Sequence, residues 1–184
     1  TAKDKMIKAY PNYGGVSLLD LLLPEFYTQK TVVFDLSHGQ CKGGWYLGDV
    51  IPDYKAMAEN NGAKFVINES EPFTEQSLKG ADVVIMLSPL QQDLQKNISD
   101  EEAKALVNFI RKGGALLVFV DEEAHRVILK DYNINAVTMP FGIEFGYDVK
   151  APNNCGAVSF INEIFSDRLE VPYSGARSVK GGIP

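Results

Sequence analysis

The chain has 184 residues, of which 45% are hydrophobic, and 24 acidic against 18 basic residues give it a net charge of -6. That length is enough to bury one full core and short for two, so we expect a single main domain. The negative charge disfavours nucleic acid and anionic membrane surfaces as partners. No apolar run approaches the ~20 residues of a membrane-spanning helix, so no span is expected.

The first 29 residues predict an N-terminal segment that packs on the main domain. They contain a Tyr-Pro-Asn-Tyr-Gly-Gly turn and then a short apolar helical pattern over residues 17–23, which Pro24 stops. Residues 30–184 are expected to form a single α/β domain that belongs to a longer protein.

Four apolar runs predict the strands of a sheet, at residues 32–36, 64–68, 81–87 and 115–120. Helices are predicted between them, at residues 51–62, 73–80 and 99–112. The last helix is the clearest, because Ser99 precedes Glu102 by three residues, as in a capping box, and Gly113 supplies a left-handed stop. This alternation predicts an open, mostly parallel sheet with helices on both faces.

The remainder of the chain is less regular. The sequence predicts a helix at residues 124–129, a short strand at 135–139, and a loop rich in Gly, Pro and Asn at 141–156. Residues 169–179 alternate enough to predict one or two terminal strands.

Polar residues follow each predicted strand and should meet at the carboxyl edge of the sheet, where open α/β folds bind ligands. These residues are Ser37, His38, Gln40 and Cys41 after the first strand, Asn68 and Glu69 after the second, Ser88 and Gln91 after the third, and Asp121, Glu122 and Glu123 after the fourth. The alternative is that they are only the polar turns in which any parallel sheet ends.

His38 is the strongest single candidate for chemistry, because it follows a buried strand and Asp35 precedes it by three residues. Its imidazole could act as an acid or a base with Asp35, Asp121 or Glu122 as the carboxylate partner. Alternatively, Asp35 and His38 only hydrogen-bond the glycine-rich loop.

The acidic triplet at residues 121–123 could raise one carboxyl pKa or hold a cation. An acidic run before a helix is more typical of a solvated cap. Because His125 is the only histidine beside the triplet, the metal signal is weak and we expect no metal site.

Cys41 and Cys155 are too few for a disulfide framework and are expected to be free thiols. Cys41 lies in a glycine-rich loop without a strand-to-helix elbow, which argues against a nucleophile. The chain has no phosphate loop and no GxGxxG after a strand, so neither a nucleotide nor another cofactor is expected. Trp45 would suit stacking on a sugar, although packing is the commoner role of a loop aromatic.

The run ADVVIMLSP and the helix and strand that end in FIRKGGALLVFVDEE resemble the class I glutamine amidotransferase-like superfamily over residues 30–182. The resemblance implies a flavodoxin-like, amidotransferase-like three-layer sandwich. Catalytic members carry a Cys at the elbow after this strand and a His-Glu pair downstream. Here the elbow reads Asp121-Glu122-Glu123, and no histidine follows His125. The resemblance is therefore to the non-catalytic branch, and glutamine amidotransferase activity is not expected.

VVFDLSHGQ and the closing YSGARSVKGG, which contains Arg177, resemble a non-catalytic subgroup of bacterial cell-envelope domains, some of them beside enzymes of unsaturated uronic-acid sugars. The resemblance implies a periplasmic or envelope accessory domain that recognises a saccharide, another small polar ligand or an adjacent protein domain. The residues expected to bind are Ser37, His38, Gln40, Trp45, Ser88, Asp121, Glu122 and Arg177. The alternative is a hydrolase of a carbohydrate-related substrate that uses His38 and a carboxylate as acid and base.

Overall fold

The computed structural model describes residues 29–40, 51–160 and 169–182, and for residues 151–160 and 169–175 it describes the backbone alone. A four-stranded parallel sheet lies at its centre, in the order β2-β1-β3-β4. Its strands are β1 (Thr31–Asp35), β2 (Lys64–Asn68), β3 (Val83–Met86) and β4 (Ala115–Val118). This order is that of flavodoxin-like doubly wound folds and confirms the predicted α/β class.

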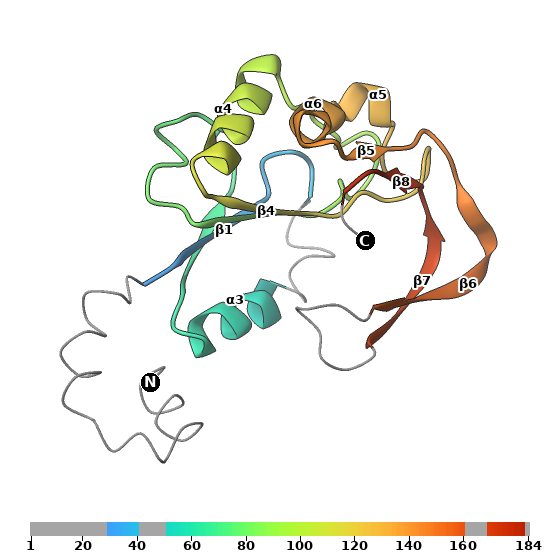
Figure 1. The fold of residues 1–184 in the computed structure, drawn as a ribbon, viewed down its shortest axis with the longest axis horizontal. Helices are drawn as coiled ribbons and strands as arrows, with labels where there is room; N and C mark the ends of the chain where they lie inside the picture. Colours follow the sequence, from blue (N-terminus) through green and yellow to red (C-terminus); the bar gives the residue numbers. More distant parts are fainter. Residues whose placement is uncertain (1–28, 41–50, 161–168, 183–184) are drawn as a thin grey trace, which may run out of the picture.

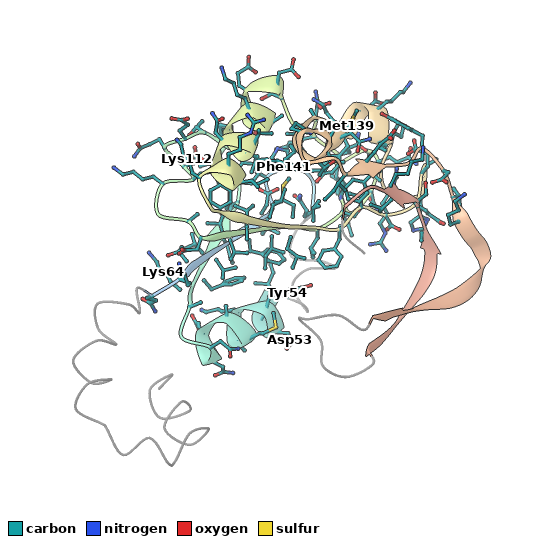
Figure 2. The ribbon with its side chains drawn as sticks, viewed as in Figure 1. Asp53, Tyr54, Lys64, Lys112, Met139 and Phe141 are labelled. Carbon is teal, nitrogen blue, oxygen red and sulfur yellow. The ribbon has the colours of Figure 1, made fainter. Side chains whose placement is uncertain are left out.

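Helices cover both faces of the sheet (Figure 1). On one face lies α3 (Ile51–Asn60), and on the other lie α4 (Asp100–Arg111), α5 (Leu129–Tyr132) and α6 (Asn135–Thr138). Within β1, Val33 joins the core under α4, whereas Phe34 joins a smaller cluster under α3. Tyr54 extends from α3 toward the sheet (Figure 2), where its ring centroid lies 5.2 Å from that of Phe34. The predicted burial of the first strand on both faces is confirmed.

The best-defined helix, α4, has the predicted capping box. The Ser99 hydroxyl accepts a hydrogen bond from the Glu102 backbone N–H, and the Glu102 carboxylate accepts one from the Ser99 backbone N–H. Ala103 and Leu106 are buried in the main core, and Gly113 takes the left-handed conformation beyond the end of the helix. The capping box and the buried apolar face both lie where the sequence predicts them, so the local sequence alone defines this helix.

Two short helices predicted from the sequence are turns in the structure. At residues 73–80, the Ser77 hydroxyl accepts from the Thr74 backbone N–H (2.8 Å) and the Thr74 hydroxyl accepts from the Ser77 backbone N–H (3.0 Å). Such side-chain bonds compete with the helical pattern. Residues 124–126 likewise form a turn, closed by a bridge between Glu123 and Val127.

Two further predictions are wrong for tertiary reasons. Residues 135–138 form α6 instead of a strand, because Val137 is buried in the core and the Asn135 amide hydrogen-bonds both backbone groups of Phe145 (2.8 and 2.9 Å). The predicted loop at residues 141–156 follows a 3-10 helix, η1 (Met139–Phe141), and contains β5 (Glu144–Phe145) and the start of β6 (Lys150–Phe160).

The C-terminal part adds two antiparallel pairs beside the main sheet. β6 pairs with β7 (Leu169–Ala176), and β5 pairs with β8 (Val179–Lys180), which confirms the predicted terminal strands. Among the described residues, no helix has the length and apolar character needed to cross a membrane.

Candidate functional site

The turn that follows β1 surrounds a buried carboxylate at the carboxyl edge of the sheet. Asp35 ends the strand, and its side chain is fully buried. Oδ1 accepts hydrogen bonds from the Ser37 backbone N–H (3.1 Å), the Ser37 hydroxyl (2.6 Å) and Asn68 Nδ2 (3.1 Å). Oδ2 accepts one from Gln40 Nε2 (3.0 Å) and lies 2.8 Å from His38 Nδ1. A buried charge needs such donors, so Asp35 organises the turn around itself.

The imidazole of His38 lies between two carboxylates and is only 3% exposed. Nδ1 faces Asp35, and Nε2 lies 3.3 Å from Glu102 Oε1. The ring stacks on Phe73, with centroids 5.5 Å apart and an interplanar angle of 11°. Burial opposes protonation of the ring, but the hydrogen bond and charge of Asp35 and the charge of Glu102 outweigh it and raise the pKa of His38. The arrangement favours an imidazolium held from both sides.

Glu102 connects His38 to the first turn of α4. Its Oε1 also accepts from the Phe73 backbone N–H (3.0 Å), and its Oε2 accepts from the Ser99 backbone N–H (3.0 Å). Burial opposes ionisation of this carboxyl, but the backbone hydrogen bonds from Ser99 and Phe73 and the charge of His38 lower its pKa. The sequence identifies Glu102 only as a helix cap, and its distance along the chain gives no sign of the contact with His38.

A small surface pocket of about 150 Å³ opens beside His38. The loops after β1, β2 and β3 and the first turn of α4 frame it. Its lining residues are Ser37, His38, Ser70, Pro72, Lys96, Asn97 and Glu102. Pockets for drug-sized ligands occupy roughly 300–1,000 Å³. This pocket therefore suits a single small polar group.

A second cluster lies where β3 and β4 end. The Ser88 hydroxyl accepts a hydrogen bond from the Asp121 backbone N–H (3.0 Å). Arg177 donates from Nε to the Asp121 carbonyl, and its Nη1 lies 3.0 Å from Glu123 Oε2. The Asp121 carboxylate pairs with Arg126 (3.3 Å). These contacts tie the segment before β8 to the end of β4.

Glu122 belongs to the same turn, but its carboxylate has fewer polar partners than those of Asp121 and Glu123. Its side chain is 17% exposed, and Oε1 lies 3.9 Å from His125 Nδ1. The buried Oε2 has no hydrogen-bond partner among the described residues.

The structure thus divides the predicted site into two clusters. Ser37, His38 and Gln40 surround Asp35, whereas Ser88, Asp121 and Arg177 lie in the second cluster. β3 separates the two parent strands, β1 and β4, in the sheet. The pocket beside His38 is lined by none of residues 121–123, so it is not the shared cleft that the sequence predicts. Trp45 and Cys41 lie outside the described residues.

The geometry limits what His38 can do as a catalyst. A general base needs a ring nitrogen within reach of the substrate proton. Both nitrogens of His38 face carboxylates, Nδ1 that of Asp35 and Nε2 that of Glu102. In the part of the chain that the structure describes, no three His, Cys, Asp or Glu side chains are grouped to hold a metal ion.

No family model matches the chain, and neither a curated protein nor a solved structure was found that matches it.

Proposed function

We propose that this chain is a non-catalytic, amidotransferase-like binding or accessory domain of a bacterial envelope protein. Its site is the pocket beside His38, and its ligand is a small polar group, either one unit of a saccharide or a side chain of a neighbouring domain. The observation that carries the proposal is the contact of His38 with both Asp35 and Glu102 (2.8 and 3.3 Å). Because each ring nitrogen faces a carboxylate, His38 forms a fixed charged side of the pocket and has no nitrogen left for catalysis.

The position of the pocket in the fold supports ligand binding. In doubly wound sheets, ligands bind at the carboxyl edge where neighbouring strands connect in opposite directions. In the order β2-β1-β3-β4 this point lies between β1 and β3. The turn after β1 contains His38, and it is bonded to the loop after β3 through the Leu90 backbone N–H and the Gly39 carbonyl (2.8 Å).

The rim of the pocket favours an acidic sugar over a neutral one. Lys96 and Asn97 are exposed there and offer an ammonium and an amide to a carboxylate and to hydroxyl groups. Behind them the His38 imidazolium lies between the carboxylates of Asp35 and Glu102, so this group adds no net positive charge and the attraction for a carboxylate comes from Lys96. The uronic acids implied by the resemblance of the first-strand motif have this combination of groups.

A thermal-shift screen of glucuronate, galacturonate and neutral oligosaccharides tests the proposal. A ligand at 100 times its Kd should stabilise the fold by about 2.7 kcal/mol, which corresponds to about 5–10 °C for a chain of this size. Lys96→Ala should remove the shift, whereas the matched control Lys104→Ala, an exposed lysine on α4 away from the pocket lining, should keep it. A ligand whose affinity ignores Lys96→Ala and Asn97→Ala would disprove the assignment of the pocket.

The second candidate function is a hydrolase of a carbohydrate-related substrate. The mostly buried carboxyl of Glu122 favours it, because its Oε2 has no hydrogen-bond partner among the described residues and a carboxyl with a free oxygen can exchange a proton with a substrate. Turnover of chromogenic uronides that is abolished by Glu122→Gln would support this function. Amidotransferase chemistry has a separate test: stoichiometric labelling of Cys41 by a glutamine-analogue electrophile would contradict the non-catalytic assignment.

A further inference from the structure

The sheet has an apolar area on the α3 side that no described residue covers. Leu117 is 44% exposed and Phe119 is 48% exposed. Their neighbours Leu116, Val118 and Val120 pack against the main core under α4. Because side chains alternate along a strand, Leu117 and Phe119 lie on the opposite face.

Packing and register place this area beside the existing α3-side cluster. Leu117 is the register partner of Ile85, which belongs to that cluster with Phe34. Among the described elements, α3 is the only helix on this face (Figure 1), and its hydrophobic residues packed against the cluster are Ile51 and Tyr54. β2 and β4 are the two edge strands of the described sheet, and α3 contacts β2, so Leu117 and Phe119 at the opposite edge stay exposed.

The N-terminal part of the sequence contains a segment with matching chemistry. Residues 16–23 read VSLLDLLL, between Gly14-Gly15 and Pro24. On a helix, Leu18 and Leu22 share one face, and Asp20 lies on the opposite face. Eight residues of helix span about 12 Å, which is close to the length of the four residues of β4, about 13 Å.

The chain can reach from this segment to the uncovered area. Residues 24–30 separate it from the first residue of β1 and extend at most about 25 Å. β4 lies two strand spacings from β1, which is about 10 Å.

We propose that residues 16–23 dock as a two-turn helix on the α3-side face of β3 and β4, with Leu18 and Leu22 against Leu117 and Phe119. The docked helix would complete the second helical layer of the sandwich. The inference does not depend on the function proposed for the pocket beside His38.

Hydrogen exchange of the full chain, followed by mass spectrometry, tests the docking. The backbone amides of residues 20–23, which donate within such a helix, should be protected at least about tenfold relative to a free peptide of the same sequence. Phe119→Asp and Leu22→Asp should each remove this protection, since a buried carboxylate is strongly disfavoured in an apolar contact. Met139→Asp changes a side chain that is 57% exposed on η1 and should leave the protection unchanged.

Light scattering at the same protein concentrations shows whether the chain is a monomer or a dimer, and so distinguishes docking within one chain from docking of a second copy. Unprotected amides at residues 20–23 in a monomeric wild-type chain would overturn the proposal. Protection that persists in Phe119→Asp would overturn the assigned face, and protection found only in a dimer would assign the surface to a second copy. Leu22→Asp leaves the described domain untouched, so loss of protection in that variant supports docking even if Phe119→Asp fails to fold.

Discussion

Replacing His38 with Asn should lower the free energy of unfolding more at pH 6 than at pH 9. Asparagine keeps a donor near the position of Nδ1 and so retains a hydrogen bond to Asp35. It removes the positive charge and the contact with Glu102, which in the wild type lies 3.3 Å from Nε2.

The size of the effect follows from the contacts. A hydrogen bond to a charged group contributes about 1.5–3 kcal/mol, and His38, only 3% exposed, makes one to Asp35 at 2.8 Å and an ion pair with Glu102 at 3.3 Å. We expect His38→Asn to lower the free energy of unfolding by about 2–4 kcal/mol at pH 6. Each unit by which the folded-state pKa exceeds the unfolded one contributes about 1.4 kcal/mol of this.

The sign follows from the raised pKa of His38. A group whose pKa is higher in the folded state gives its full stabilisation below the unfolded value, here 6.5, and loses it as the pH rises through the folded value. The pKa of Glu102 is lowered, so its own contribution disappears only in acid. Measurements above pH 5.5 therefore isolate His38.

Urea denaturation between pH 5.5 and 9.5 measures the difference between wild type and variant. Glu102→Gln keeps a capping side chain but removes one of the two charges, so in that background His38→Asn should show a weaker pH dependence. His125→Gln removes an exposed histidine and should change the free energy of unfolding by less than about 0.5 kcal/mol. A stability difference that is constant across this range, or that grows with pH, would refute the charged bridge.

Three other substitutions, with Lys104→Ala as a control, test the fold around the site by chemical denaturation. Leu106→Ala should cost about 2–5 kcal/mol because the side chain is fully buried, whereas Lys104→Ala on the exposed side of α4 should cost little; equal losses would mean that the helical phase is wrong. Gly39→Ala should be severely destabilising, because φ is +93° and a Cβ would lie 2.2 Å from the Leu94 carbonyl oxygen; a native melting temperature would contradict this turn. Ser99→Ala should cost about 0.5–2 kcal/mol through loss of the cap, and no change would show that the capping box contributes nothing.

The predictions from sequence succeeded where structure depends on neighbours along the chain. The strands of the main sheet are continuous apolar runs, and α4 contains its own cap and apolar stripe. Asp35 and His38 are three residues apart, so their hydrogen bond could be anticipated as one of two alternatives. Such features need no information about distant residues.

Tertiary structure decided the features that depend on distant contacts. The sequence of α6 predicts a strand, but the pairing of Asn135 with the Phe145 backbone and the burial of Val137 stabilise a helix. Glu102 faces His38 from 64 positions away only because the sheet brings the start of α4 over the end of β1. Local propensity amounts to a fraction of a kcal/mol per residue, and burial or a charged contact contributes several times more, so the packed fold overrules the local sequence at these positions.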